Sequence, residues 1–357
     1  MKIAVGMSGG VDSSTAALIL KEQGHEVIGI SMALWDGSEK CSGKGKHSCY
    51  GPDEKEDIAE TKKVCDSIGI PFFVLDCSKE YKSTIIEYFK SEYMCARTPN
   101  PCVLCNYKIK FDALLKNAQM SGISFDKFAT GHYANVEHDK ESGRYLLKKA
   151  SDKRKDQTYF LYRLSQSQLS NVMFPLGDLT KEEVRGYARE KGLRVAEKEE
   201  SQDFYGGDYR ELLDMQDEEG DIVLTTGEVV GRHRGLWNYT PGQRRGMGIA
   251  HPEPLYVIRL DSKTNTVVAG IKSEIIITDF IVNDLNWIAV EKPEASFKAQ
   301  TKVRSSQNYY DSFIEIINDK EVKVTLKDAG AAISPGQSAV FYSGDIVIGG
   351  GIIDRVV

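Results

Sequence analysis

The stretch "KIAVGMSGGVDSSTAALIL", Lys2 to Leu20, decides the fold of this chain. Its opening "KIAVGMS" is a short apolar run typical of a buried strand, and "SSTAALILKEQG" is typical of a helix that ends at Gly24. Between them, Gly6, Gly9 and Gly10 let the backbone turn sharply and approach a ligand closely. A strand, a glycine-rich turn and a helix in this order predict the start of a parallel α/β sheet.

The segments that follow repeat this alternation. The pattern predicts a second strand at Glu26–Leu34, a helix at Asp57–Gly69 and a third strand at Pro71–Cys77. We therefore expect a doubly wound parallel sheet with helices on both faces. Ligands of such sheets bind at the carboxyl ends of the strands.

The second half of the chain has a different residue pattern. After about Gln202, short β-branched runs alternate with turn signals, as in "EVKVTLKD" and "SAVFYSGDIVIGGGII". A chain of 357 residues is also too long for one hydrophobic core. We expect an α/β domain at 1–202, a small β-rich linking domain at 203–272 and a C-terminal β-barrel at 273–357.

Composition excludes several classes of protein. A net charge of −6 argues against a protein that coats nucleic acid indiscriminately. Three runs are candidates for a local basic face: "KIK" at Lys108–Lys110, "KKASDKRKDQ" at Lys148–Gln157 and "GQRRG" at Gly242–Gly246. Each run alone is typical of a solvated surface, and only their convergence on one site would be informative. No apolar run is long enough to span a membrane, and the start shows no signal peptide, so we expect a cytoplasmic protein. Seven cysteines, an odd number, do not suggest a disulfide framework.

The glycine-rich turn has the features of a phosphate site. Ser8, Ser13 and Ser14 add hydroxyl donors, and the following helix presents its free N–H groups and positive dipole end to the same point. The turn has no lysine where a GxxxxGK[ST] loop would place one. This absence argues against kinase or GTPase chemistry.

A second motif is "RTPNPCVLCNYKIKF", Arg97 to Phe111, which contains a cysteine pair. The pair Cys102 and Cys105 is compatible with half of a metal site, a redox couple, or a nucleophile with a helper. A structural zinc site that adds Cys41 and Cys49 has poor ligand spacing. The remaining cysteines, Cys65, Cys77 and Cys95, are expected to be buried in apolar surroundings.

Together these motifs resemble a known family. The SGGxDS pattern is similar to the PP-loop of the ATP pyrophosphatases, and further segments resemble the signatures of the tRNA-specific 2-thiouridylase family in the same order. They are "TPNPCVLCNYKIKF", "ATGHYA", "KDQTYFLYRL", "FPLGDLTKEEVR", "ESQDF", "YTPGQRRGMGI" and "ISPGQSAVFY". The resemblance covers essentially the whole chain.

The resemblance implies an ATP-dependent tRNA uridine 2-sulfurtransferase. Such an enzyme adenylates the 2-oxygen of the wobble uridine and replaces it with sulfur, and the cysteine before Asn106, Cys105, carries that sulfur. Cys102 and Asp12 would assist, Asp12 by helping to hold Mg²⁺. The implied ATP contacts are Gly6, Met7, Ser8, Gly9, Gly10, Val11, Asp12, Ser13, Met32 and Gly131.

The same resemblance implies partners and an RNA-binding surface. The partners are the glutamate, glutamine and lysine tRNAs, contacted at the anticodon stem-loop, and a sulfur donor that is a protein or free sulfide. The implied RNA contacts are Asn100, Pro101, Cys102, His132, Lys155, Asp156, Gln157, Arg304, Ser305 and Gln337. His132 and Gln337 also suit purely structural roles. Two rival functions remain: another PP-loop adenylating ligase or amidotransferase, and a cluster-bearing RNA-binding protein without activity.

The chain departs from the family pattern at its cysteines. Many members carry a second cysteine in the "ESQD" segment, where this chain has Tyr205, and Cys102 replaces a more common aspartate. Either Cys102 resolves a persulfide on Cys105, or both thiols help to hold a [4Fe-4S] cluster. Cys49 is the favoured third ligand of such a cluster and Cys41 the fallback. The loss of the resolving thiol together with the gain of Cys49 and Cys102 favours the cluster, because sulfur that arrives as sulfide requires no disulfide.

Overall fold

A computed structural model describes residues 1–37, 48–198, 203–213, 217–327 and 332–357. Cys41 and most of the "ESQD" segment therefore lie outside the described residues. The chain forms two compact units. Unit 1 comprises Met1–Ile86, Pro101–Leu212 and Asp345–Val347, and unit 2 comprises Glu87–Asn100, Leu213–Gly344 and Ile348–Val357. Within the described part of the chain, no helix has the length and apolar character needed to cross a bilayer.

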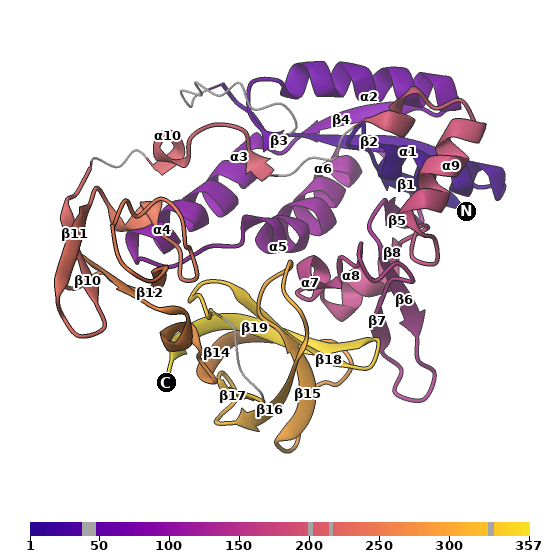
Figure 1. The fold of residues 1–357 in the computed structure, drawn as a ribbon. Helices are drawn as coiled ribbons and strands as arrows, with labels where there is room; N and C mark the ends of the chain where they lie inside the picture. Colours follow the sequence, from indigo (N-terminus) through magenta and orange to yellow (C-terminus); the bar gives the residue numbers. More distant parts are fainter. Residues whose placement is uncertain (38–47, 199–202, 214–216, 328–331) are drawn as a thin grey trace. The chain divides into compact units, whose positions relative to one another are not determined.

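Unit 1 is built on a five-stranded sheet, which confirms the predicted doubly wound architecture (Figure 1). Its order is β4-β2-β1-β5-β8, and every pairing is parallel. The strands are β1 (Lys2–Gly6), β2 (Glu26–Ala33), β4 (Phe72–Asp76), β5 (Lys127–Thr130) and β8 (Val172–Met173). After β1 the chain adds β2 and β4 on one side of β1 and later returns to the other side with β5. The order therefore reverses between β1 and β5, where ligands of open α/β sheets bind.

Helices cover both faces of this sheet because successive strand residues point to opposite sides. On one face, α1 (Val11–Glu22), α2 (Glu54–Ile68) and α9 (Lys181–Glu190) share a buried cluster with β1. On the other face, the π-helix η2 (Asn106–Ala113) leads into α6 (Leu114–Met120). There the rings of Phe111 and Phe128 lie 5.5 Å apart.

Shorter elements complete unit 1. They are β3 (Ser48–Tyr50), α3 (Ser78–Tyr81), η1 (Lys82–Ile86), α5 (Pro101–Cys105), β6 (Ala134–His138), β7 (Tyr145–Lys149), α7 (Thr158–Leu161), α8 (Gln166–Asn171), η3 (Arg194–Glu197) and β9 (Asp203–Tyr205). The helix α10 (Tyr209–Leu213) lies at the end of this unit. The strands β3 and β9 pair in parallel with each other.

Unit 2 contains two β structures and one early helix, α4 (Glu87–Met94). A four-stranded sheet has the order β11-β10-β13-β12. Its elements are β10 (Gly220–Leu224), β11 (Val229–His233), η4 (Leu236–Asn238), β12 (Tyr256–Asp261), β13 (Thr266–Gly270) and η5 (Lys272–Ile275). Ala96, from the early segment, packs against the core of this sheet.

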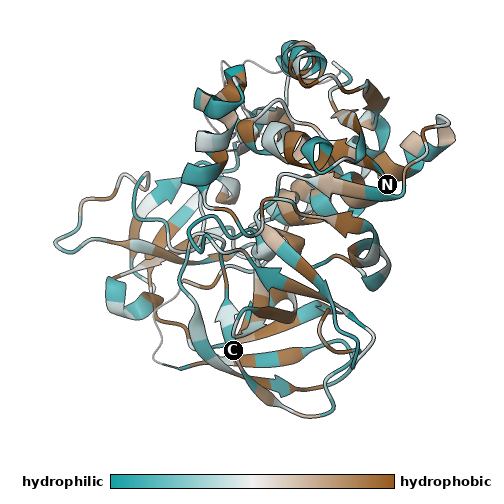
Figure 2. Cartoon of the chain, turned by 90° about the vertical axis from the view of Figure 1, so that its right-hand side faces the viewer, coloured by the Kyte–Doolittle hydropathy of each residue, from teal (hydrophilic) through white to brown (hydrophobic). Residues whose placement is uncertain are grey.

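The C-terminal strands of unit 2 close into a barrel, as predicted. They are β14 (Asp279–Trp287), β15 (Phe297–Lys302), β16 (Tyr310–Ile316), β17 (Val322–Leu326), β18 (Ser338–Ser343) and β19 (Ile346–Val356). Closure follows because β14 pairs with both β17 and β19. Along β16 and β17, buried residues alternate with more exposed ones, since alternate side chains face the barrel core. Figure 2 colours the strands of the chain by the hydropathy of each residue.

Burial of the cysteines agrees only in part with the sequence prediction. Cys65 and Cys77 are fully buried, whereas Cys95 is exposed, so the prediction for Cys95 was wrong. Cys95 directly follows α4, where the helix ends in a turn, and the apolar spacing of the preceding residues no longer determines which way a side chain points.

Candidate active site

The phosphate loop lies at the point where the strand order reverses. Gly6 ends β1 and is paired with Ile30 of β2 and Thr130 of β5. Gly10 is the N-cap of α1 and has no side chain that could cap this helix, so the first N–H groups of α1 face the loop. Gly9 has φ +67°, and a Cβ there would lie 2.6 Å from Thr61 Oγ1. The loop therefore has the backbone geometry of an anion site.

The other expected ATP contacts lie at the same edge of the sheet. Met32 is close to the carboxyl end of β2 and is half-buried. Gly131 directly follows β5, and a Cβ at this position would lie 2.6 Å from the backbone of Asp12 and Ser13. Glycine thus permits the close approach of the β5 end to the first turn of α1.

Asp12 is the most heavily engaged side chain of the loop. Both of its carboxylate oxygens accept hydrogen bonds from Lys181 Nζ, each at 2.8 Å. The hydroxyl of Tyr133 donates to Asp12 Oδ1 at 2.9 Å. Lys181 is the first residue of α9, and its side chain is only 9% exposed. The loop therefore carries a buried cation that the chain supplies from outside the motif.

The "ATGHY" and "KDQT" segments are hydrogen-bonded to each other. Gln157 Oε1 accepts from the backbone N–H of Tyr133 at 2.8 Å. Asp156 accepts from Ala150 N at 3.1 Å and from Thr158 Oγ1 at 2.7 Å. Two of the expected RNA contacts thus have structural partners, and the third, Lys155, is half-buried.

His132 is held at the end of β5. Its Nδ1 lies 2.7 Å from Thr130 Oγ1, and its ring packs near Phe111 and Phe174. Burial, with a smaller effect from the charge of Lys110, lowers the pKa of His132 well below its usual value. The imidazole is therefore neutral at physiological pH.

The cysteine pair occupies the short helix α5 and differs in exposure. Cys102 is exposed, whereas Cys105 is half-buried at the end of the helix, where the π-helix η2 begins. Burial raises the pKa of the Cys105 thiol to about 12, and Lys110 acts in the opposite direction. His132, at the end of β5, packs near Phe111 of η2, the helix that directly follows Cys105, so α5 lies in the neighbourhood of the sheet edge that carries the loop.

Cys49 lies near the pair, on the strand β3. This strand pairs with β9, with Tyr50 opposite Tyr205. Tyr205 is buried, and its hydroxyl donates to Glu211 at 2.9 Å. The pKa of Tyr81 is raised well above its usual value. Burial is the largest cause, and the charges of the thiols of Cys105, Cys49 and Cys102 act in the same direction. The three thiols therefore lie in the neighbourhood of one buried tyrosine.

This neighbourhood does not amount to a metal-ligand set. In the portions of the chain that the structure describes, no three His, Cys, Asp or Glu side chains are arranged to hold a metal ion. The three thiolates have the right chemistry for an iron–sulfur cluster. Their arrangement in this conformation does not fit one.

Of the remaining residues expected to contact RNA, Pro101 begins α5 in unit 1, and the others lie in unit 2. Gln337 Nε2 donates to the carbonyl oxygens of Thr98 at 3.1 Å and Pro99 at 2.9 Å. These two hydrogen bonds hold the "TPNP" segment. Arg304 donates to the carbonyl of Pro241 at 2.6 Å, and Ser305 is exposed. Asn100 follows this segment, and its backbone N–H donates to the hydroxyl of Tyr88 at 3.2 Å.

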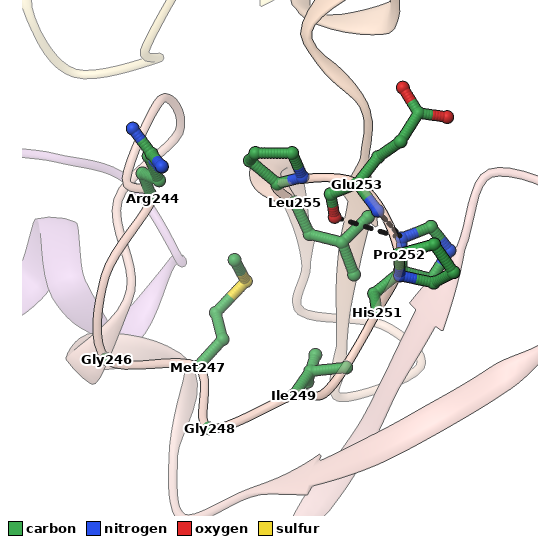
Figure 3. A pocket seen from close by; sticks show the side chains of 10 residues that line it. Arg244, Gly246, Met247, Gly248, Ile249, His251, Pro252, Glu253 and Leu255 are labelled. Atoms are coloured by element: carbon green, nitrogen blue, oxygen red, sulfur yellow. Dashed lines mark hydrogen bonds between the residues drawn. The ribbon is translucent and has the colours of Figure 1, made fainter.

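A pocket of about 310 Å³ adjoins the "YTPGQRRGMGI" segment of unit 2 (Figure 3). Met247 and Leu255 point into it, with Arg244 on one side and His251 on the other. Arg244 and its neighbour Arg245 are exposed. Both belong to the "GQRRG" run, whose role as a local basic face stays a prediction.

Three residues of the site were missed by sequence reasoning: Lys181, Tyr133 and Lys110. The sequence around Lys181 contains a pattern that could have indicated its role. The pattern "TKEE" places Thr180 as N-cap and Glu183 as the partner in a capping box, so Lys181 is a cation at the positive end of a helix. Such a placement is unfavourable without a nearby anion. Tyr133 and Lys110 had no comparable signal.

Three family models match consecutive parts of the chain. They are described as "tRNA methyl transferase HUP domain" for residues 1–205, "tRNA methyl transferase PRC-barrel domain" for 213–270 and "Aminomethyltransferase beta-barrel domain" for 277–353. They agree with an α/β domain, a small β domain and a barrel. The domain boundaries at 202 and 272 stay predictions.

Curated relatives match over their whole length. The tRNA-specific 2-thiouridylase MnmA of Endomicrobium trichonymphae is 46% identical over 356 residues, which cover 99% of both chains. That of Acetivibrio thermocellus is 43% identical over 359 residues, again 99% of both. The 2-thiouridylase MnmA 2 of Caldanaerobacter subterraneus is 43% identical over 363 residues, which cover 100% of this chain and 98% of the relative. With a fold, a phosphate loop and a cysteine helix that agree with this similarity, the chain belongs to the MnmA family of tRNA-specific 2-thiouridylases.

Proposed function

We propose that this protein is an ATP-dependent tRNA uridine 2-sulfurtransferase that converts the wobble uridine to 2-thiouridine. The observation that carries the proposal is the end-to-end similarity to 2-thiouridylases. The names of two domain models mention methyl transfer. An anion loop for ATP and a nearby thiol pair suit thiolation better, because methyl transfer needs neither.

The first step is activation of the uracil oxygen. O2 attacks the α-phosphorus of ATP, the bond to the bridging oxygen breaks, and pyrophosphate leaves while N3 gives up its proton. The loop between β1 and α1 binds the departing pyrophosphate through uncapped N–H groups. C2 now carries AMP, which is a far better leaving group than the original oxygen.

Asp12 is the residue that suits Mg²⁺. A single carboxylate beside bound phosphates is a common Mg²⁺ arrangement, and Asp12 lies in the first turn of α1. The ion would neutralise charge on the phosphates.

The second step is delivery of sulfur by Cys105. The terminal sulfur of a Cys105 persulfide attacks C2, and AMP leaves with the C2–O electrons. The Cys102 thiolate then attacks Cys105 Sγ and breaks the S–S bond, whose electrons pass to the sulfur on C2. N3 regains the proton that Cys102 released, and 2-thiouridine and a Cys102–Cys105 disulfide result. A dithiol reductant resets the enzyme.

The position of the cysteines on α5 supports this relay. Residues three apart on a helix are neighbours, so Cys102 lies within reach of Cys105. The two thiols also differ in burial, which separates an exposed resolving thiol from a protected sulfur carrier.

The second candidate for the sulfur step is a [4Fe-4S] cluster held by Cys49, Cys102 and Cys105. It is supported by the common neighbourhood of these thiols around Tyr81. The arrangement of the described residues does not provide a ligand set for such a cluster. Anaerobically prepared protein without thiolate-to-iron absorption at about 400 nm would exclude it.

Binding of RNA is assigned to unit 2 and to the sheet edge of unit 1. In unit 2 we include the "TPNP" segment held by Gln337, and the exposed Arg244 and Arg245, which are suited to phosphate contacts. In unit 1 we include His132, whose neutral ring suits hydrogen bonding to a base. The resemblance implies glutamate, glutamine and lysine tRNAs as substrates.

The test is reconstitution under anaerobic conditions. Enzyme is incubated with ATP, unmodified tRNA and either a persulfide donor or sulfide, and the nucleosides are analysed by mass spectrometry. We expect 2-thiouridine from the parent protein and none from Cys105→Ser, which should still release pyrophosphate. Cys95→Ser, an exposed cysteine of unit 2, is the matched control and should keep full activity.

The same assay separates the alternatives. Full activity of Cys49→Ser with sulfide would remove the cluster, and pyrophosphate release without any thiolation by the parent protein would favour a different adenylating ligase. Binding of tRNA with no pyrophosphate release would indicate a non-catalytic RNA-binding protein.

A further inference from the structure

The phosphate loop contains no lysine, yet a lysine reaches it from a distant part of the chain. Lys181 Nζ lies 2.8 Å from both carboxylate oxygens of Asp12. Asp12 is in the first turn of α1, the end of the helix that faces the loop. The ammonium is therefore at the place where a bound polyphosphate would put its charge.

Two costs make this lysine unlike a simple structural contact. Its ammonium is largely removed from water, since the side chain is 9% exposed. It also stands at the first position of α9, where the helix dipole disfavours a cation. Asp12 offsets both costs, and Tyr133 further orients Asp12 through its hydroxyl at 2.9 Å.

We propose that Lys181 binds the polyphosphate of ATP, and then the leaving pyrophosphate, in place of the lysine that the loop lacks. This inference rests on the proposed function. In the free enzyme the Asp12 carboxylate serves as the counter-charge of Lys181. When the nucleotide enters, phosphate oxygens take over that role, and the carboxylate becomes available to a cation bound with the phosphates.

A second lysine offers a close structural comparison. Lys191 Nζ lies 2.8 Å from Glu22 Oε1 and joins the far ends of the same two helices, α1 and α9. Its side chain is 33% exposed and distant along both helices from the loop. If Lys181 only joined α1 to α9, the two ion pairs would have the same role.

The experiment measures binding of inorganic pyrophosphate to the full-length protein by calorimetry, with and without Mg²⁺. Lys181→Met is expected to weaken binding by about 10- to 100-fold, the usual effect of losing a charge-assisted hydrogen bond. Lys191→Met is expected to bind within about twofold of the parent protein. The KM for ATP should rise with Lys181→Met only.

Unchanged pyrophosphate affinity in folded Lys181→Met would overturn the inference, as would an equal loss in Lys191→Met. If Lys181→Met does not fold, the double variant Asp12→Asn with Lys181→Met is compared with Asp12→Asn alone. The double variant leaves no unpaired charge, and equal affinity of these two proteins would again overturn the inference. Because pyrophosphate binding needs no tRNA, failure of this test is distinct from failure of thiolation itself.

Discussion

The burial of Cys105 predicts an unusually slow reaction with alkylating reagents. Only the thiolate reacts, and burial raises the pKa of this thiol from the ordinary 9.0 to about 12. At pH 8 about one tenth of ordinary thiols are ionised, against about one in ten thousand at Cys105. We therefore expect iodoacetamide to modify Cys105 about 1,000-fold more slowly in the folded protein than in urea.

The assay uses the Cys102→Ser variant, so that the peptide carries one thiol, and quantifies modification by mass spectrometry between pH 7 and 10. The rate should rise about tenfold per pH unit over the whole range, because the pKa lies above it. A rate that levels off near pH 9 would mean that Cys105 has an ordinary pKa, and it would contradict the raised value. A rate within tenfold of that in urea would refute the reasoning altogether.

A charge substitution tests the cause of the shift. Lys110 acts to lower the pKa of Cys105, so Lys110→Met should slow alkylation several-fold further. The matched control is Lys108→Met, whose ammonium lies 4.3 Å from the Tyr107 ring centroid and is not among the charges with the largest effect on the thiol. Equal effects of the two variants would contradict the assignment.

Three further predictions concern stability and RNA binding. Burial raises the pKa of Cys65 and Cys77 to about 12, so the folded state holds these protons more tightly. The stability that these protonated thiols contribute is complete below about pH 9, and above it falls by up to about 1.4 kcal/mol per pH unit for each thiol. In urea unfolding, Cys65→Ala and Cys77→Ala should therefore lose less free energy of unfolding between pH 9 and 10 than the parent protein loses. Gln337→Ala removes both hydrogen bonds to the "TPNP" carbonyls, so the KM for tRNA should rise about tenfold with the KM for ATP unchanged; an unchanged KM for tRNA would remove this residue from the RNA site. Replacing Arg244 and Arg245 by alanine should weaken tRNA binding and reduce its salt dependence by up to about two units of slope; filter binding at several salt concentrations measures this, and an unchanged slope would contradict phosphate contacts there.

The fold was predictable because its signals are local. The strand β1, the turn at Gly9 and Gly10, and the helix α1 are adjacent in sequence, and each has its own pattern of apolar or glycine residues. The parallel order followed from the alternation of strands and helices. The barrel was likewise evident in short β-branched runs.

The site was less predictable because its contacts join distant segments. Asp12 and Lys181 are separated by 169 positions, and no sequence pattern in either segment indicates that the two residues are in contact. The burial of Cys105 depends on how α5 packs, which the CxxC spacing does not determine. Cys95 was predicted to be buried because its neighbours in sequence are apolar, but α4 ends one residue before it and its side chain is exposed.

Neither unit is a continuous piece of chain, and this has a consequence for biosynthesis. Ala96 leaves the ribosome long before the strands of the core against which it packs. In unit 1, the backbone N–H of Lys149 donates to the carbonyl of Asp345 at 2.8 Å, so the hairpin β6–β7 awaits residues that are translated much later. A nascent chain cannot complete the two units one after the other. Each unit must therefore wait until its distant segments have left the ribosome, and until then its unpaired surfaces are open to aggregation.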